Sequence, residues 1–178
     1  DPSDGVLSPS TRLRLSTGQL MPLIGMGTGW ANCARDTHGL EVDWLGLRNE
    51  RPWGTVDFVK QMRGALDAGG FGGTQLVLVD GGMPGESDAL GTQSRADPAF
   101  AASYAAVGLH YPCDAKPDAA HFVVGEMGKR FWASEDWWSE AEWEGAACWA
   151  KLFNQNFVRM NQTSSIAWSL IWSVYETG

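Results

Sequence analysis

The sequence predicts an α/β fold, the later part of a (β/α)8 TIM barrel, and three observations lead to this prediction. First, short apolar runs without polar alternation recur along the chain, as expected for parallel strands that are covered on both faces. Second, these runs close on polar residues able to carry chemistry, which is typical of the catalytic face of such a barrel. Third, the chain has 178 residues, fewer than the roughly 250 of a complete barrel.

The elements of this fold are predicted in chain order from apolar runs and helical spacing. Strands are expected at 42–47, 75–79, 105–109, 129–133 and 165–174. Helices are expected at 55–68, more weakly at 98–103, and at 148–159. We take these strands as about the fourth to the eighth of the barrel, in a segment of residues 38–178. Residues 1–37 fit the pattern poorly, and the apolar run 20–26 within them is a candidate for the third strand.

Charge and composition argue against several classes of partner. Lysine and arginine number 13 and aspartate and glutamate 21, which gives a net charge of −8. A nucleic acid or an anionic membrane surface requires a basic face, so neither is expected as a partner. No apolar run approaches the roughly 20 residues of a membrane span, so no integral membrane segment is expected. The cysteines Cys33, Cys113 and Cys148 fit no metal-binding spacing, and no metal site is expected.

Two glutamates at predicted strand ends are the strongest candidates for catalysis. Glu50 ends the strand at 42–47 and Glu135 ends the strand at 129–133, about three βαβ repeats later at roughly 30 residues each. The fourth and seventh strand ends of a barrel face each other across its central pocket, so we expect the two carboxyl groups to meet there. A carboxyl pair about 5–5.5 Å apart serves a retaining glycoside hydrolase, one group as acid/base and the other as nucleophile. Asn49, next to Glu50, could donate a hydrogen bond to the sugar 2-hydroxyl group.

Tryptophans near strand ends could offer flat apolar faces to sugar rings. They are Trp44, Trp53, Trp132, Trp137, Trp138 and Trp168. Each candidate has a plainer alternative: a glutamate at a strand end is usually a solvated loop residue, and a buried tryptophan is usually part of the core. His110 and Tyr111, at the end of the strand at 105–109, could likewise be packing residues.

Several blocks of sequence together resemble one known family. The segments VDWLGLRNER at 42–51, GLHYP at 108–112 and WASED at 132–136 contain the residues singled out above. Further blocks are GAACW at 145–149, LFNQNF at 152–157 and TSSIAW at 163–168. In this order they resemble the galactocerebrosidase family, glycoside hydrolase family 59, over residues 38–177.

The resemblance implies a role for each candidate. Glu50 would be the proton donor, Glu135 the nucleophile and Asn49 the contact to the 2-hydroxyl group. The other substrate-binding residues would be His110, Tyr111, Trp132 and Trp168. The substrate would be galactosylceramide or a related β-galactosyl lipid, cleaved without a cofactor in a lysosomal or secreted setting, with a lipid-presenting activator protein as partner. Cys148 would pair with a later cysteine beyond this chain.

Departures from the family pattern leave alternatives open. Arg48 stands where the family has a tryptophan, which places a cation beside the expected proton donor. Residues 15–28 look more like the first strand of an aldo-keto reductase, which would bind NADP. Another retaining β-glycosidase of the same barrel clan, such as a glucosylceramidase or a galactanase, would keep Asn49, Glu50 and Glu135. A truncated chain that carries the motifs without catalysis is the remaining alternative.

Overall fold

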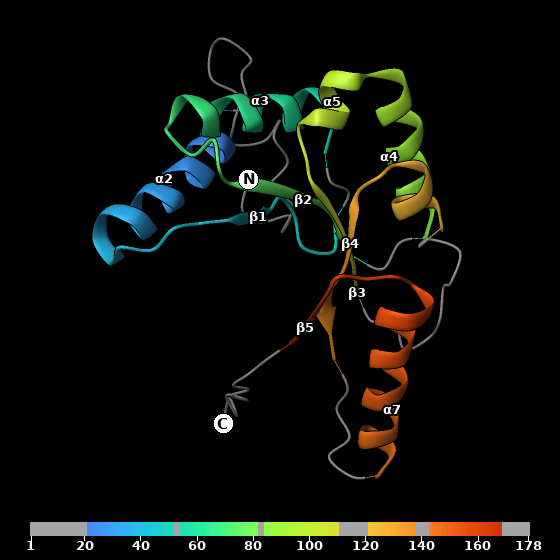
Figure 1. Cartoon of the computed structure of the whole chain (residues 1–178). Helices are drawn as coiled ribbons and strands as arrows, with labels where there is room; N and C mark the ends of the chain where they lie inside the picture. Colours follow the sequence, from blue (N-terminus) through green and yellow to red (C-terminus); the bar gives the residue numbers. More distant parts are fainter. Residues whose placement is uncertain (1–20, 52–53, 82–83, 111–120, 138–142, 169–178) are drawn as a thin grey trace, which may run out of the picture. The chain divides into compact units, whose positions relative to one another are not determined.

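The computed structural model describes residues 21–51, 54–81, 84–110, 121–137 and 143–168 (Figure 1). These residues divide into two compact units. The first unit comprises the described parts of 1–47, 53–77 and 93–105, and the second those of 48–52, 78–92 and 106–178. Some expectations fall outside the described residues, namely those for Trp53, Tyr111, Cys113, Trp138 and positions 169–174.

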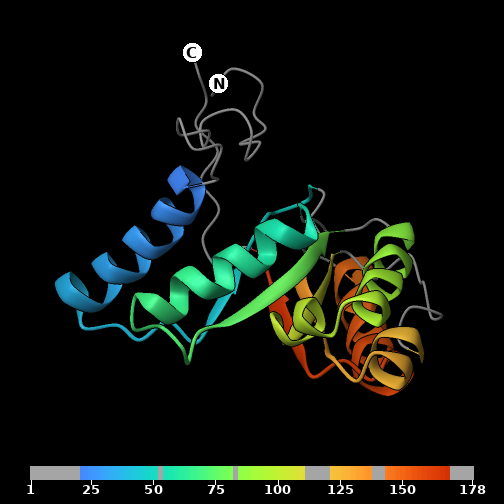
Figure 2. The ribbon, with the colours of Figure 1, turned by 90° about the horizontal axis from the view of Figure 1, so that it is seen from above.

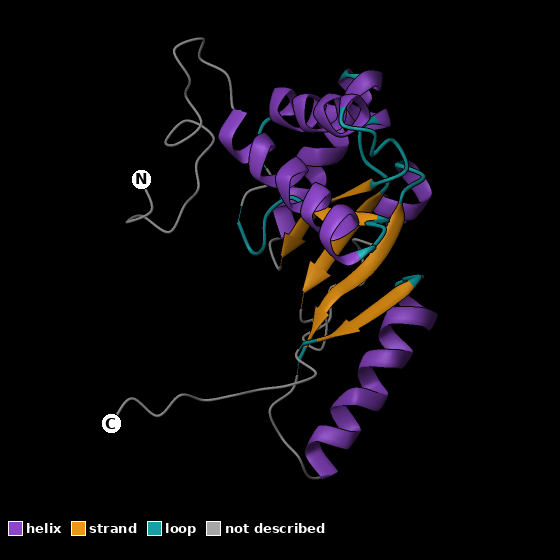
Figure 3. Ribbon diagram, turned by 90° about the vertical axis from the view of Figure 1, so that its left-hand side faces the viewer, coloured by secondary structure: helices purple, strands orange, loops and turns teal. Residues whose placement is uncertain are grey.

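Five strands form one sheet whose spatial order follows the chain order. They are β1 (Trp44–Gly46), β2 (Gln75–Gly81), β3 (Ala106–His110), β4 (Arg130–Asp136) and β5 (Ser164–Ala167), drawn in orange in Figure 3. Strand β1 pairs in parallel with β2, and β4 pairs in parallel with both β3 and β5. Sequential order is the arrangement of an α/β barrel, whereas a doubly wound sheet reverses its order partway. The fold is therefore part of an α/β barrel, as predicted.

In its described part, the first unit contains the whole of helices α2 (Met21–His38), α3 (Val56–Ala68) and α5 (Pro98–Ala102). Helix α3 begins after its N-cap Thr55, whose hydroxyl group accepts a hydrogen bond from the amide of Phe58. Its buried face repeats at helical spacing and consists of Phe58, Val59, Met62 and Leu66. Helix α2 contacts α3 (blue and teal in Figure 2), so the apolar faces of these helices form the core of this unit.

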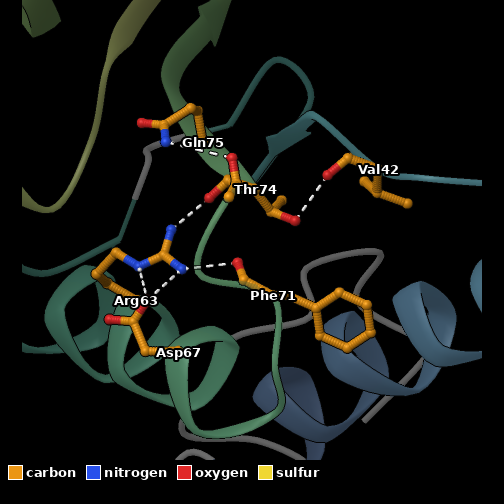
Figure 4. A network of polar contacts seen from close by, with 7 residues as sticks. Val42, Arg63, Asp67, Phe71, Thr74 and Gln75 are labelled. Atoms are coloured by element: carbon orange, nitrogen blue, oxygen red, sulfur yellow. Dashed lines mark hydrogen bonds and ion pairs between the residues drawn. The ribbon is translucent and has the colours of Figure 1, made fainter.

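A hydrogen-bond network fixes the loop that leads from α3 into β2 (Figure 4). Arg63 donates to the Asp67 carboxylate at 2.6 and 3.0 Å and to the carbonyl oxygen of Phe71 at 3.0 Å. It also donates to the carbonyl oxygen of Thr74. The Thr74 hydroxyl group in turn donates to the carbonyl oxygen of Val42 over 2.6 Å. Arg63 thus connects helix α3 to the residues just before β2. Thr74 connects the same residues to Val42, which lies just before β1.

The second unit contains β3, β4 and β5 together with helix α7 (Trp143–Phe153). Helix α7 continues as the π-helical segment η4 (Asn154–Arg159), and a second π-helical segment, η3 (His121–Glu126), precedes β4. Helix α4 (Pro84–Ala96) begins in this unit and ends in the first. Every residue of β3 is buried. An apolar strand with both faces covered is what the sequence predicted for a central position in a parallel sheet.

The candidate strand at 20–26 is wrong for the residues that the structure describes. From Met21 onward this run forms the first turns of helix α2, which continues to His38. A short apolar run fits a helix as well as a strand, and Pro22 lies in the first turn, where proline is tolerated. The strand implied by the likeness to an aldo-keto reductase is absent from residues 21–28 for the same reason.

The cysteines also differ from expectation. Cys148 is disulfide-bonded and buried, while Cys33 is a free, exposed thiol. The expectation that Cys148 finds its partner beyond this chain is therefore wrong, because the bond forms within it.

No helix in the described part of the chain combines the length and the apolar character needed to cross a membrane.

Candidate active site

Four ionisable residues from the ends of successive strands come together in the second unit. Glu50 follows β1, Asp80 lies near the end of β2, His110 is the last residue of β3, and Glu135 is the penultimate residue of β4. The carboxyl ends of neighbouring parallel strands lie at the same edge of a sheet, which is where an α/β barrel places its active site. The fold therefore brings together residues that are far apart in the sequence.

The backbone at two of these strand ends adopts an unusual conformation. The φ angles of Glu50, Val79 and Asp80 are 50°, 73° and 41°, in the left-handed region that residues with a side chain seldom occupy. For a β-branched residue such as Val79 this is a true outlier, and each strained residue costs about 1–3 kcal/mol. The strain turns the end of β2 so that the carbonyl oxygen of Asp80 accepts a hydrogen bond from the amide of Glu50 over 2.8 Å.

An irregularity between β3 and β4 determines which residue lies beside His110. Leu109 is paired with Ala133, but the register then shifts, so that His110 is paired with Glu135 and not with Ser134. Successive residues of a strand point to opposite faces, so a shift of one residue changes which side chain faces the site. The shift places Glu135 next to the histidine.

The imidazole of His110 is the centre of the cluster. Its side chain is 1% exposed, and its Nδ1 atom lies 3.2 Å from Oε1 of Glu50. Its Nε2 atom lies 3.0 Å from Oδ1 of Asp80. The nearest oxygen of Glu135 lies 3.8 Å from Nδ1. Both ring nitrogens are thus occupied by carboxylates, with a third carboxylate close by.

This arrangement favours the protonated form of His110. Burial by itself lowers the pKa of His110. The hydrogen bonds to Asp80 and Glu50 and the negative charges of Asp80 and Glu135 outweigh this effect, so the pKa is raised overall. A neutral imidazole can donate from only one nitrogen, whereas the imidazolium ion donates from both. The doubly protonated ring is therefore the form that satisfies both carboxylates.

The two glutamates predicted to be catalytic lie close together. One oxygen of Glu50, one oxygen of Glu135 and a ring nitrogen of His110 all lie within 4.8 Å of one another. This spacing is close to the roughly 5–5.5 Å between the carboxyl groups of a retaining glycoside hydrolase. The side chain of Glu50 is 48% exposed and that of Glu135 is 14% exposed, so one carboxyl group is open to water while the other is largely enclosed.

The same three side chains are also a group that could hold a divalent metal ion. Nitrogen and oxygen donors of this kind suit Zn²⁺, which requires the histidine to be neutral. Because the raised pKa of His110 favours the proton on the ring, a metal would have to displace it.

A polar cluster forms around Asp136, the residue that follows Glu135. Oδ2 of Asp136 accepts hydrogen bonds from Nδ2 of Asn156 at 2.8 Å and from Oγ of Ser165 at 2.5 Å. Burial raises the pKa of Asp136, although these two bonds oppose the shift. Oδ1 of Asp136 has no hydrogen-bond partner among the described residues. The cluster joins β4, β5 and η4 immediately after Glu135 and so determines where that residue lies.

Exposed tryptophans follow the same strand ends. Trp137 and Trp168 are 41% and 40% exposed, and their rings meet edge to face with centroids 6.2 Å apart. The backbone of Trp168 donates to the carbonyl oxygen of Asp136 over 2.8 Å, which places Trp168 beside the end of β4. Nε1 of Trp132 donates to Oγ1 of Thr163 over 3.2 Å.

The structure thus brings together Glu50, His110 and Glu135, and it places exposed Asn49 directly before Glu50. Tyr111 lies outside the described residues. Asp80 closes the predicted strand at 75–79 and so is one of the polar strand-end residues expected from the sequence, but the sequence analysis assigned it no role in the site. The contacts that would have distinguished it depend on the left-handed turn at Val79 and Asp80, which no local motif predicts.

Comparison with known proteins gives the following matches. The sequence model of glycosyl hydrolase family 59 matches residues 23–178, so the match begins before residue 38, where the motifs placed it. A galactocerebrosidase of Danio rerio is 32% identical over 147 residues, and one of Mus musculus is 32% identical over 150 residues. The Homo sapiens galactocerebrosidase is 29% identical over 147 residues. Each match takes in 83% of this chain and 20–21% of the relative, so the chain spans about a fifth of the length of these relatives.

Solved structures agree on the fold. SrfJ of Salmonella typhimurium superposes with a TM-score of 0.65 at 16% identity, covering 81% of this chain and 36% of that one. A glycoside hydrolase family 30 xylanase of Clostridium acetobutylicum gives a TM-score of 0.63 at 18% identity, covering 84% of this chain and 40% of that one. In each case the described chain corresponds to part of a larger fold.

Proposed function

Because this chain belongs to glycosyl hydrolase family 59, we propose that it carries the catalytic part of a retaining glycosidase for galactosylceramide or related β-galactosyl lipids. Glu50 is the acid/base and Glu135 the nucleophile of a double displacement. The observation that carries this proposal is the approach of one Glu50 oxygen and one Glu135 oxygen to within 4.8 Å at the ends of parallel strands.

In the first step, the Glu135 carboxylate attacks the anomeric carbon and forms a covalent galactosyl ester. The bond from that carbon to the lipid oxygen breaks, and Glu50 donates its proton to the departing oxygen. In the second step Glu50 takes a proton from water, whose oxygen attacks the same carbon and releases galactose and the Glu135 carboxylate. The greater exposure of Glu50 fits the residue that exchanges protons with the lipid oxygen and with water.

We assign the five strands to positions four to eight of the barrel. Glu50 follows β1 and Glu135 lies in β4, three strands later in the sheet order. This spacing supports an acid/base after the fourth strand and a nucleophile at the seventh.

The remaining substrate contacts are proposed from exposure and position. Asn49 contacts the sugar 2-hydroxyl group, and the exposed ring of Trp168 and the half-buried ring of Trp132 form an apolar surface for the galactose or the lipid. The sequence also placed His110 and Tyr111 in the binding set; of these, the buried His110 can act on the substrate only through its neighbours. A lysosomal or secreted setting and a lipid-presenting activator partner are part of the same proposal. Asn161, in an Asn-Gln-Thr glycosylation sequence, is exposed, as the attachment of a glycan in a secreted protein would require.

The test is fluorophore release from an aryl β-galactoside beside the matching β-glucoside, with Glu41→Ala as an exposed-glutamate control. We expect galactoside turnover by the wild type and by Glu41→Ala, and its loss in Glu135→Ala. Preference for the glucoside would favour the glucosylceramidase-type alternative, and no turnover by folded protein would contradict catalysis by this chain.

Azide distinguishes the two roles by stereochemistry. With Glu135→Ala, azide enters the space vacated by the nucleophile and gives the α-galactosyl azide after one inversion. With Glu50→Ala and a good leaving group, azide replaces water in the second step and gives the β-galactosyl azide. The reverse pattern would exchange the proposed roles, and no product from either variant would contradict the two-step mechanism.

A further inference from the structure

The cluster contains one acidic residue for which the proposed reaction has no use. Asp80 is 20% exposed, and its Oδ1 atom lies 3.0 Å from Nε2 of His110, on the opposite side of the ring from Glu50. Its carbonyl oxygen also accepts the amide hydrogen of Glu50 at 2.8 Å. Asp80 is therefore linked to Glu50 in two ways. Their backbones are joined by a direct hydrogen bond, and their side chains both bind the imidazole ring of His110.

We propose that Asp80 and His110 are positioning residues, in which Asp80 orients the His110 ring and the ring holds the Glu50 carboxyl group beside Glu135. The proposal rests on the proposed function for its catalytic meaning. It extends that function to Asp80, and it gives His110 a role through Glu50 in place of direct contact with the sugar.

Burial supports this role for His110. A side chain that is 1% exposed offers little surface to a substrate. Both ring nitrogens already face carboxylate oxygens, so neither is left to bind a hydroxyl group of a sugar. Rotation of the ring would break both hydrogen bonds at once, and the pair of carboxylates therefore fixes its orientation.

The charge on His110 explains why its pairing with Asp80 affects the position of the Glu50 side chain. Among the described residues, Glu50, Asp80 and Glu135 lie against the His110 ring, and the charge of Asp136 also interacts with it; all four are acidic. When the ring loses its proton, only one of its two nitrogens can still donate. Glu50 is the most exposed of the three nearest carboxylates, so it is the one that can turn to water and lose its alignment.

The experiment compares Asp80→Asn with Asp43→Asn, an exposed aspartate that serves as the matched control. His38→Gln, at an exposed helix end, is the control for His110→Gln. Long-range ¹H–¹⁵N spectra follow the titration of the His110 ring, which is assigned by its absence in His110→Gln. Parallel assays measure kcat, KM and the pH profile of galactoside hydrolysis, and circular dichroism confirms that each variant is folded.

For Asp80→Asn we expect His110 to lose its proton at lower pH than in the wild type. We expect kcat to fall by about 10²-fold, the loss typical of a misplacement near 1 Å, with little change in KM. The alkaline limb of the pH profile should move to lower pH, because the ring deprotonates earlier. A purely structural role for Asp80 would lower the melting temperature without moving this limb.

The two parts of the proposal fail separately. If His110 titrates identically in Asp80→Asn and the wild type, the pairing is wrong, whatever the activity. If the titration shifts but kcat and the pH profile match Asp43→Asn, the pairing exists and the positioning role is overturned. Absence of turnover by the wild type would contradict the proposed function, while the NMR titration would still decide the pairing.

Discussion

The amide nitrogen of Glu50 donates to the carbonyl oxygen of Asp80 over 2.8 Å, so the proposed proton donor is joined to strand β2 by its backbone. Asp80 in turn pairs with His110 at the end of β3, and His110 is in register with Glu135 of β4. Four consecutive strand ends are thus linked by contacts between neighbours. A disturbance at any one of them is expected to reach the catalytic pair.

The first prediction concerns pH and stability. The pKa of His110 is raised in the folded chain above its ordinary value of about 6.5. Protonation of His110 therefore stabilises the fold fully at pH values below about 6.5, and this stabilisation is lost as the pH rises through the raised pKa. We expect the free energy of unfolding in urea to decrease over that range. His110→Gln should remove this decrease and exposed His38→Gln should keep it. An equal decrease in both variants would assign it to other groups.

The second prediction concerns Gly108 in β3. A Cβ atom there would lie 3.0 Å from Cβ of Ser134 and 3.1 Å from Cα of Asp80, closer than ordinary contacts. Gly108→Ala should push Asp80 from His110 and lower both the melting temperature and kcat. Gly64→Ala, where a Cβ meets no atom within 4 Å on a helix surface, should instead stabilise the fold by about 0.5–1 kcal/mol. Equal melting temperatures for the two variants would contradict the close approach.

The third prediction separates charge from hydrogen bonding at Asp136. Asp136→Ala leaves the donors of Asn156 and Ser165 without their shared acceptor, at about 1–3 kcal/mol for each buried group. Asp136→Asn keeps an acceptor and removes a buried charge. Because burial raises the pKa of Asp136, the wild type loses stability relative to Asp136→Asn as the pH rises through that pKa. Urea unfolding from pH 3 to 7 measures both effects, and a pH-independent difference would contradict the shift.

The fourth prediction concerns Zn²⁺ at the group formed by Glu50, His110 and Glu135. The metal requires a neutral imidazole, and the raised pKa of His110 opposes this. Any Zn²⁺ binding that calorimetry detects at this group should therefore be weak near pH 5 and strengthen as the pH increases. Glu135→Gln should weaken it, and Glu41→Gln, an exposed substitution outside this group, should not. Binding that is independent of pH would exclude His110 as a ligand.

The fifth prediction concerns the paired tryptophans. Trp168→Ala removes an exposed ring that meets Trp137 edge to face. Its loss should raise KM for a lipid-linked galactoside more than for a small aryl galactoside, with kcat largely preserved. Trp143→Ala, at 84% exposure on α7, is the matched control. An equal effect on both substrates would place Trp168 at the sugar and not at the lipid.

The strands were well predicted because a strand that is buried on both faces appears in the sequence as a continuous apolar run. The run at 75–79 corresponds to β2, which ends at Gly81, and the run at 105–109 corresponds to β3 within one residue. Helix α3 was predicted one residue early, at its N-cap Thr55. Helix α4 was not predicted, because its glycines and polar residues show no apolar face in the sequence. The predictions therefore succeeded where burial is regular.

The sequence suggested candidate site residues, but it could not predict the contacts between them. Glu50, Glu135 and His110 follow from the rule that barrel chemistry lies at strand ends. Their arrangement depends on the register shift at Leu109 and His110 and on the left-handed backbone at Val79 and Asp80. Both features change which side chains point toward the site. The alternation of apolar and polar residues along a strand does not predict such changes. The pairing of Asp80 with His110 therefore required the structure.

The left-handed conformation of Val79 bears on how this protein would respond to selection for heat resistance. Val79 is almost fully buried, yet its backbone is in a region that a β-branched residue disfavours. Substitutions that let residues 79 and 80 relax would gain thermal tolerance soonest, and they would do so by letting the end of β2 move away from Glu50. We expect heat-resistant variants selected at these positions to hydrolyse the galactoside more slowly. The relaxed turn would favour thermal stability, whereas the strained turn would favour the proposed reaction.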